Sequence, residues 1–192
     1  MIESVLQRKN VKAGIRLTIK TALSAALIAV AVLLPQLVHL AAGAEGGMRW
    51  LPMYLPVLLG GCLLGWRWGL GVGILAPLVS FAVTSATGSP MPAAARLPYM
   101  MAELAVFAAV SGAFSSAVSK NAWMAFPAVL LASVSGRLFF LAFAAVFQSA
   151  SPLSAAAVWS QIQAGLPGLV LQAVVVPFVV MGIAALLNRN KK

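Results

Sequence analysis

The chain has 192 residues, of which 62% are apolar and only 8% are charged, and its mean hydropathy is +1.00. A soluble domain has about 45–50% apolar and about 25% charged residues, so the composition excludes large soluble modules and indicates an integral membrane protein. Because a spanning helix needs about 20 apolar residues, residues 1–192 predict a single all-α membrane domain, a bundle of six transmembrane helices.

Acidic and metal-binding side chains are scarce. The chain has 13 Lys and Arg residues against three acids, Glu3, Glu45 and Glu103, which gives a net charge of +10. Cys62 is the single cysteine and His39 the single histidine. This inventory excludes a disulfide within the chain, a cluster of thiolate ligands and catalysis by neighbouring carboxylates. We therefore expect no metal site and no cofactor.

The first 20 residues are a basic, amphipathic lead, and an apolar run from Thr21 to Leu40 follows that is long enough to span a membrane. The small residues Ala42, Gly43 and Ala44 resemble a signal-peptidase site, so a cleaved signal peptide is the alternative. We favour an uncleaved first helix, because the run exceeds a typical signal core and makes the helix count even.

Five further apolar segments are separated by turn-forming residues. A Gly-rich loop, 43–49, precedes the second helix, which Pro52 and Pro56 should bend. Residues 65–69 predict a tight connection, and the Pro-rich segment 84–98 predicts a loop. The predicted helices after the first are Trp50–Leu64, Leu70–Val83, Tyr99–Val118, Ala122–Phe147 and Leu166–Leu187, so that the bundle spans about residues 21–187.

The distribution of basic residues predicts the orientation. With the amino terminus inside, ten of them lie on the cytoplasmic face, Arg49 and Arg96 lie outside, and Arg137 lies within a helix. The ten are Arg8, Lys9, Lys12, Arg16, Lys20, Arg67, Lys120, Arg189, Lys191 and Lys192. Since basic residues collect in cytoplasmic loops, both termini are expected to be cytoplasmic, in a multi-pass protein of a cell membrane.

Motifs for enzyme chemistry are missing from the sequence. It contains no G-x-x-x-x-G-K-[ST] phosphate loop and no Asp to hold magnesium, so the chain does not hydrolyse ATP by itself. A single His excludes an H-E-x-x-H protease site. A membrane serine protease built on Ser135 is disfavoured, because His39 lies at the outer end of the first helix. We expect a protein that is not an enzyme.

Three polar side chains are predicted to share the outer half of the membrane. From a rise of about 1.5 Å per residue, Glu103 and Gln172 each lie about 9 Å below the outer start of their helices. Arg137 lies about 15 Å below the outer end of its helix. A charge near the bilayer centre costs about 2.5–3.5 kcal/mol and needs a partner, water or a ligand.

Two interpretations of these polar groups remain open. In one, Glu103 and Arg137 form an internal ion pair, and Gln172 is a hydrogen-bond donor between helices. In the other, the three line a pocket that is open to the outside and holds a polar solute. The residues that could cover that pocket are Trp50, Tyr54, Thr84, Thr87 and Tyr99. The combination of all these residues favours a substrate-binding site.

Small residues recur along one side of the first helix. Gly14, Thr18, Ala22 and Ala26 are spaced by four positions, and Ala25 and Ala29 form a parallel pair. Such a strip lets another helix approach closely, which is how helices associate in lipid. It serves either packing within this chain or the docking of a second membrane subunit.

Many positions spread over the chain form one recognisable pattern. They are Leu55, Pro56, Val57, Leu58, Leu59, Gly60, Gly61, Leu63, Leu64, Gly65, Arg67, Gly69, Gly73, Pro77, Leu78, Ser80, Thr87, Gly88, Pro90, Met101, Glu103, Leu104, Gly136, Arg137, Gly165, Pro167, Gly168 and Gln172. With these positions, the chain resembles the substrate-binding (S) component of energy-coupling factor (ECF) vitamin transporters over roughly residues 18–187.

The resemblance implies a six-helix subunit that binds a vitamin or related micronutrient from the outer face. It further implies that Ala22 and Ala26, or Ala25 and Ala29, dock on a transmembrane coupling subunit that carries two cytoplasmic ATPases. Cobalamin, pantothenate, riboflavin, folate and queuosine-type precursors all remain open as solutes. The alternatives are a stand-alone secondary carrier or channel, in which Glu103 titrates with proton movement, and a structural membrane subunit that binds no solute.

Overall fold

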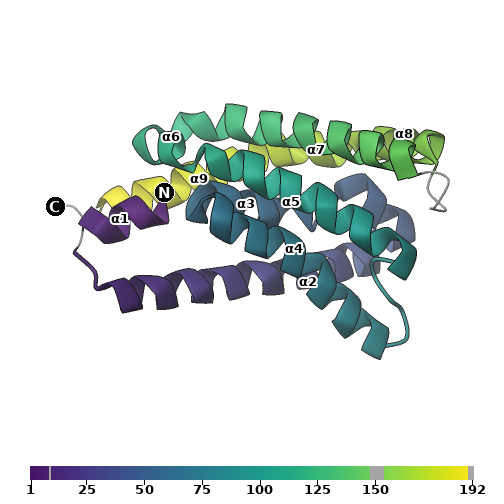
Figure 1. Ribbon diagram of the computed structural model, residues 1–192, viewed down its shortest axis with the longest axis horizontal. Coiled ribbons are helices and arrows are strands. Elements are labelled where there is room, and N and C mark those ends of the chain that lie inside the picture. The colour runs from purple at the N-terminus through teal and green to yellow at the C-terminus, as the bar shows by residue number, and fades with distance from the viewer. Residues whose placement is uncertain (9, 148–153, 190–192) are drawn as a thin grey trace.

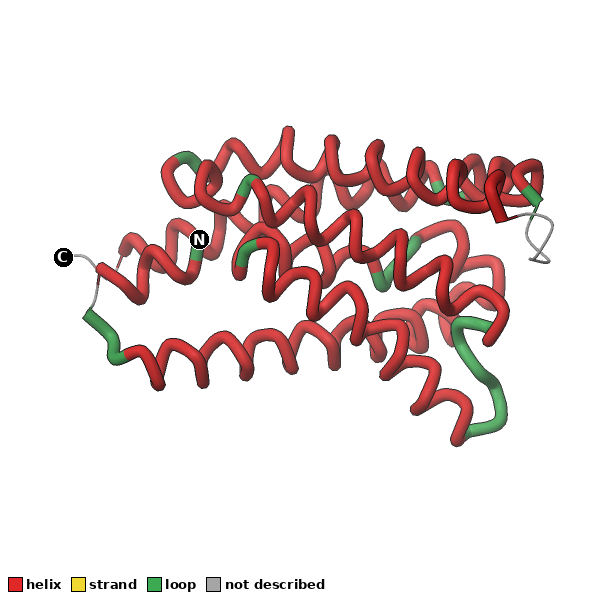
Figure 2. The backbone as a smooth tube through the Cα atoms, viewed as in Figure 1, coloured by secondary structure: helices red, strands yellow, loops and turns green. Residues whose placement is uncertain are grey.

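The computed structural model describes residues 1–8, 10–147 and 154–189, and this part of the chain contains helices and no strands (Figures 1 and 2). The elements are α1 (Ile2–Arg8), α2 (Ala13–Trp50), α3 (Tyr54–Leu64), α4 (Trp66–Ala86), η1 (Ala94–Arg96), α5 (Leu97–Ala113), α6 (Ser115–Lys120), η2 (Ala122–Met124), α7 (Ala125–Phe147), α8 (Ala155–Ala164) and α9 (Leu166–Arg189).

Six helical segments in the described part are long and apolar enough to cross a membrane, which confirms the predicted fold class. They are Ala13–Gly43, Glu45–Leu64, Trp66–Ala86, Ala94–Ala113, Ala122–Phe147 and Ala156–Leu187. Each exceeds or approaches the length that a hydrocarbon layer of about 30 Å requires at 1.5 Å per residue.

Helix α3 forms the centre of the bundle. It is short, and its residues from Pro56 to Leu64 are all buried. Helices α4 and α5 pack against it, α5 also packs against α7, and α7 packs against α9. The long α2 lies along α3 and α4 and leaves most of its surface exposed. An apolar helix can face lipid or lie inside a bundle. The close approach of α5 at Gly61, where a Cβ would meet the Ala108 carbonyl oxygen at 2.8 Å, favours the central place of α3.

The basic lead is more helical than the sequence analysis predicted. The first spanning helix begins at Ala13 and not at Thr21. The residues between them contain no proline, and Leu, Lys and Arg are good helix formers that outweigh the single Gly14. The long side chains of Arg16 and Lys20 can reach the membrane surface while their backbone stays helical. The lead also contains the separate helix α1.

Three predicted connections are shorter in the structure. In the predicted 43–49 loop only Gly43 leaves the helix, with φ 68°, and helical structure resumes to Trp50. Of residues 65–69 only Gly65 is outside a helix, with φ 89°. Both values lie in the left-handed region that glycine adopts without strain. Helix α4 continues to Ala86, so the following loop is shorter than predicted.

Two further differences concern the later helices. The predicted helix Tyr99–Val118 is divided at Phe114 into α5 and the short α6. Helix α8 was not predicted; its serine N-cap, Ser154, accepts a hydrogen bond from the Ala157 backbone N–H at 3.2 Å, a common way to start a helix. Figure 2 shows that the longest described connection joins α4 to α5.

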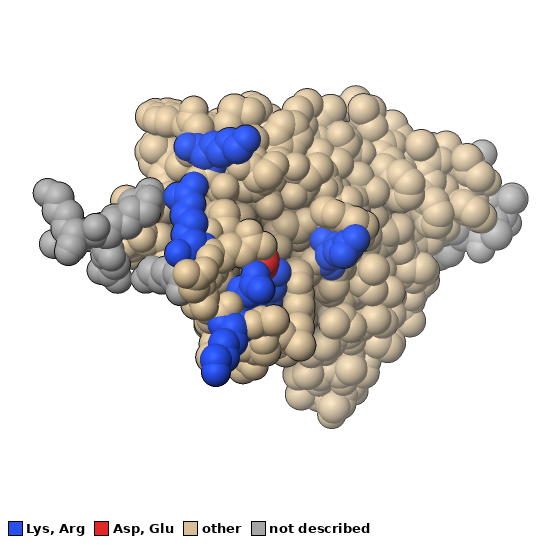
Figure 3. All heavy atoms as spheres, turned by 60° about the vertical axis from the view of Figure 1, so that its left-hand side comes forward, with Lys and Arg blue, Asp and Glu red and all other residues tan. Residues whose placement is uncertain are grey.

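Helix α1 folds back against the basic end of the bundle. The Glu3 carboxylate forms ion pairs with Lys20 and with Arg16, whose Nη1 lies 3.2 Å from Oε1. The hydrogen bond from Lys20 holds the pKa of the Glu3 carboxyl below its usual range. Figure 3 shows Lys and Arg side chains gathered around this end. Lys9, Lys191 and Lys192, which entered the orientation prediction, lie outside the described residues.

Both ends of the described chain lie at the same end of the bundle, α1 beside the end of α9, whereas α8 and the connection from α4 to α5 lie at the opposite end (Figure 1). This arrangement fits an even number of crossings. The side of the membrane that each end faces stays a prediction.

Candidate solute-binding pocket

Three buried polar side chains from three helices meet inside the bundle. Arg137 Nη1 of α7 lies 2.8 Å from Glu103 Oε1 of α5. The Tyr54 hydroxyl of α3 donates a hydrogen bond of 2.5 Å to Glu103 Oε2. Glu103 is 1% exposed and Arg137 5% exposed. The structure therefore brings Glu103 and Arg137 together, as the first of the two interpretations expects.

The surroundings of this pair compensate the two charges only in part. The Arg137 guanidinium carbon lies 5.0 Å from the centre of the Tyr54 ring, a favourable position for a cation. Its Nη1 is close to Glu103 but is not aligned as a hydrogen-bond donor, and none of the three guanidinium nitrogens has an aligned acceptor among the described residues. Charge attraction, rather than a bidentate hydrogen-bonded fork, holds the pair.

Aromatic packing fixes the position of Tyr54. The Phe107 ring of α5 meets the Tyr54 ring edge-on, with 5.0 Å between their centres. Both residues are buried, Phe107 completely. Phe107 lies four residues after Glu103, so one face of α5 supplies both the partner of the Tyr54 hydroxyl and the partner of its ring. This packing limits the side chain to the position from which it reaches Glu103.

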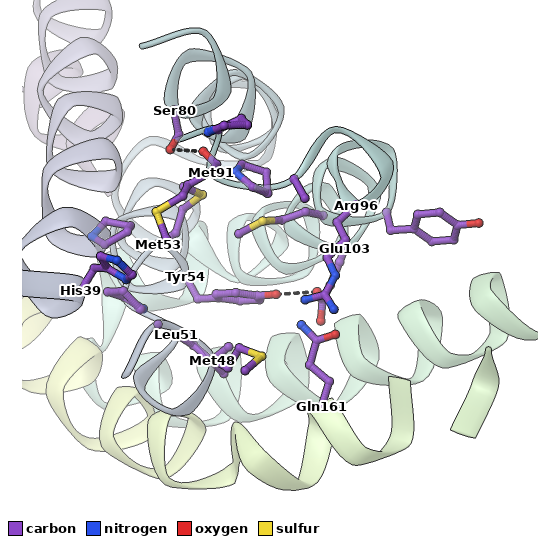
Figure 4. A pocket seen from close by; sticks show the side chains of 18 of the residues that line it. His39, Met48, Leu51, Met53, Tyr54, Ser80, Met91, Arg96, Glu103 and Gln161 are labelled. Carbon is purple, nitrogen blue, oxygen red and sulfur yellow. Dashed lines mark hydrogen bonds between the residues drawn. The ribbon is translucent and has the colours of Figure 1, made fainter. Parts of the chain in front are cut away.

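A cavity of about 340 Å³ adjoins this cluster. Glu103 and Tyr54 form part of its wall, and α2, the segment that follows α4, α5 and α8 supply further wall residues (Figure 4). Most of the wall is apolar and is rich in methionine and proline. These residues are Pro35, Met48, Leu51, Pro52, Met53, Pro90, Met91, Pro92, Ala93, Met100 and Phe140.

A few polar side chains interrupt the apolar wall: His39, Ser80, Arg96 and Gln161, besides Glu103 and the two tyrosines. Figure 4 shows the Tyr54 hydroxyl pointing towards Glu103, with Arg96 and Gln161 on that same side of the cavity and His39 on the other. A largely apolar pocket with a small number of polar groups is the usual form of a small-molecule site.

The loop beside the cavity is held by hydroxyl groups of α4. The Ser80 hydroxyl donates to the Met91 carbonyl oxygen at 2.8 Å. The Thr84 hydroxyl oxygen accepts from the Met91 backbone N–H at 2.7 Å, and the Thr87 hydroxyl donates to the Thr84 carbonyl oxygen at 2.8 Å. These bonds place Met91 in the wall and account for Thr84 and Thr87 without contact to a solute.

The eight predicted substrate-binding residues fall into two groups: those that line the cavity and those that do not. Tyr54, Tyr99 and Glu103 line the cavity, and the other five do not. Arg137 lies behind Glu103 as its ion-pair partner. Gln172 does not join the pair.

The Gln172 amide instead supports the end of α2. Its Nε2 donates to the Leu51 carbonyl oxygen at 2.8 Å and lies 3.4 Å from that of Trp50. Leu51 has φ 49° and ends α2, and its carbonyl also accepts a hydrogen bond from the Tyr54 backbone N–H at 3.1 Å. The Trp50 side chain is 39% exposed. The depth of Gln172 in its helix could be estimated from the sequence. Its hydrogen-bond partner, the Leu51 carbonyl, could not, because nothing in the sequence indicates which backbone group of another helix lies opposite.

His39, Arg96, Gln161 and the wall methionines line the cavity although they were not predicted as site residues. Four of the eight methionines of the chain line this one cavity. They come from separate segments, so only the fold brings them together. Among the described residues, no group of three His, Cys, Asp or Glu side chains could hold a metal ion.

The small-residue strip of α2 lies on its exposed side. Ala22, Ala25, Ala26 and Ala29 are all exposed in the described structure. Leu27 and Ile28, next to them in sequence, pack against the core. Intramolecular packing therefore does not use the strip, which faces lipid or a partner.

The comparisons with known proteins agree with this architecture. Residues 19–180 match the family described as "ECF transporter, substrate-specific component". The search of curated proteins found no significant match, and the search of solved structures also found none. The family match covers all six spanning helices at least in part, including Glu103 and Arg137. The chain belongs to the family of substrate-specific components of ECF transporters.

Proposed function

We propose that this chain captures a vitamin or related micronutrient at the outer face of a bacterial cell membrane and delivers it through an ECF importer. The observation that carries the proposal is the cavity beside Glu103 and Tyr54, in a bundle of this family. A transmembrane coupling subunit and two cytoplasmic ATPases complete the importer, and the chain itself acts as a binding subunit rather than as an enzyme.

The size and the chemistry of the cavity support solute capture. Its volume of about 340 Å³ lies within the range of about 300–1,000 Å³ that small-molecule pockets occupy. Tyr54, Tyr99 and Glu103 contact the solute directly in this proposal. Arg137 acts through Glu103, whose carboxylate it holds in place. Trp50, Thr84, Thr87 and Gln172 shape the segments around the cavity.

The position of the cavity supports binding from outside. Residues of the connection from α4 to α5 form part of its wall, and Figure 1 shows that connection at the end of the bundle opposite α1. The basic residues of α1 and of the first turns of α2 gather at the other end. If that basic end is cytoplasmic, as the distribution of Lys and Arg predicts, the cavity faces the outside of the cell.

The exposed strip supports docking of a coupling subunit. Ala22, Ala25, Ala26 and Ala29 lie in the half of α2 nearer the basic end. Small residues let a partner helix approach closely, and packing of this kind replaces the hydrophobic drive that lipid does not supply. A partner docked there contacts α2 without covering the cavity wall, so capture and docking use different surfaces.

The test is co-expression of this chain with the coupling subunit and ATPases encoded in the same genome. The proposal predicts that a tagged chain co-purifies with all three and that uptake of a micronutrient requires ATP hydrolysis. Failure to assemble would refute it. Transport into liposomes by this chain alone, driven by a pH gradient, would instead support a secondary carrier.

A further inference from the structure

The wall of the cavity carries one positive charge that no acidic group compensates. Among the described residues of the wall, Glu103 carries the one carboxyl group and Arg96 the one guanidinium group. Glu103 already has an ion-pair partner in Arg137 and a hydrogen bond from Tyr54. Within the described residues, the ion pairs involve Glu3 and Glu103 as acids, and neither is paired with Arg96.

The remaining acid does not change this balance. Glu45 lies on the helical segment before Trp50, is exposed and is not part of the cavity wall. It has no ion pair within 4.0 Å in the part of the chain that the structure describes. When Arg137 is counted with Glu103, the groups in and directly behind the wall are therefore net positive.

The rest of the wall suits an apolar body. Four methionine side chains surround the cavity together with Leu51 and Phe140. Thioethers are flexible and polarisable, and they make favourable contacts with aromatic rings. Arg96 and Gln161 lie on one side of the cavity together with Glu103, and His39 lies on the other side (Figure 4). Apart from these groups, Ser80 and the tyrosines, the wall offers apolar surface.

Given the proposed function, we infer that the solute carries a single anionic group, such as a carboxylate, on an apolar body that contains a ring. Arg96 pairs with the anion, the Gln161 amide donates to it, and the methionines surround the ring. A cationic solute is rejected because it brings a second positive charge to Arg96. A neutral solute of the same shape loses the charge-assisted hydrogen bond, the stronger kind of polar contact.

The experiment uses three probes of nearly equal shape: 4-phenylbutyrate, 4-phenylbutan-1-ol and 4-phenylbutylamine. Their binding to the full chain in nanodiscs is measured by equilibrium dialysis at pH 7, with empty nanodiscs as the control for partition into lipid. We expect the acid to bind at least about tenfold more tightly than the alcohol, as expected for a hydrogen bond to a charged group. We expect the amine to bind most weakly.

Two matched variants assign the preference to a residue. Arg96→Gln should reduce the affinity for the acid to that for the alcohol and leave the affinity for the alcohol unchanged. Arg49→Gln removes a cation whose guanidinium stacks 5.9 Å from the Trp50 ring and that lies outside the wall. The preference for the acid should persist in this control.

Equal binding of acid and alcohol, or a preference for the acid that survives Arg96→Gln, would overturn the inference. So would the absence of binding of all three probes by a chain that still supports ATP-dependent uptake with its partners. In each of these cases the proposed function stands. If the chain neither assembles nor supports uptake, the proposed function fails, and the inference that depends on it fails as well.

Discussion

The substitution Glu103→Gln tests whether the buried pair stabilises the bundle. It keeps the shape of the side chain and an oxygen that can accept from the Tyr54 hydroxyl, but it removes the negative charge 2.8 Å from Arg137 Nη1. Arg137, which is 5% exposed, then becomes a buried cation without a counter-charge.

The expected loss of stability follows from that distance. At 2.8 Å and an effective dielectric constant of about 20, the gross attraction is about 6 kcal/mol. Removing one partner of a buried pair typically costs about 3–5 kcal/mol, and an isolated Arg at the centre of a membrane helix costs about 2.5–3.5 kcal/mol. We therefore expect the free energy of unfolding to fall by about 3–5 kcal/mol. For a chain of this length this corresponds to a Tm lowered by roughly 6–20 °C.

The assay is thermal unfolding of the purified chain followed by tryptophan fluorescence. Tyr54→Phe is the matched control, because it removes one hydrogen bond to the carboxylate, worth about 1.5–3 kcal/mol, and leaves the ion pair. In the double variant Glu103→Gln with Arg137→Gln both charges are absent, and the Tm should recover at least half of the loss. A wild-type Tm for Glu103→Gln, or additive losses in the double variant, would refute the reasoning.

Three further predictions concern other parts of the chain. Ala26→Trp should abolish co-purification with the coupling subunit and leave probe binding unchanged. The control Ala41→Trp, about 22 Å further along α2, should permit assembly. Loss of probe binding in Ala26→Trp would indicate that Ala26 packs within this chain. Gln172→Leu should lower the free energy of unfolding by about 0.5–1.5 kcal/mol, because it removes one of two hydrogen bonds to the Leu51 carbonyl, which keeps the bond from the Tyr54 backbone N–H; a wild-type thermal transition would contradict this role. The pKa of Glu3 is lowered in the folded state, so the stability that its ion pairs give to the docked α1 is present above the unfolded pKa and is lost as the pH falls through the folded pKa. Hydrogen exchange of α1 should therefore increase at acidic pH, and in Glu3→Gln it should already be high at neutral pH. Exchange in Glu3→Gln equal to that of the wild type would count against the ion pairs.

The helix count and the depth of the buried charges could be predicted from the sequence. Long apolar runs identify spans because an unpaired backbone is excluded from lipid. Glu103 and Arg137 could be placed in the same half of the membrane by counting residues along their helices. Whether Glu103 and Arg137 form a pair or both face a cavity depends on how α5 and α7 are rotated about their axes. That rotation is set by small residues and side-chain packing at the helix contacts, which residue counting does not reveal.

Other features of the site depend on contacts between distant segments. Gln172 has nearly the depth of Glu103, but its amide meets the Leu51 carbonyl, which is available only because α2 ends there in a left-handed conformation. Arg96 was predicted as an outer charge and lies in the cavity wall. The segment that carries it is held by Thr84 through the Met91 backbone N–H, a tertiary constraint that periodicity does not reveal.

The central claim is that the cavity beside Glu103 holds a captured solute, and native mass spectrometry of the purified chain tests it most directly. The chain, isolated from cells grown in rich medium, should carry one small molecule at close to one per chain. Ala93→Trp, which introduces an indole into the cavity wall, should abolish this adduct while the chain still assembles with its coupling subunit. A wild-type chain without a bound small molecule, or an adduct that is equally abundant in Ala93→Trp, would contradict the account.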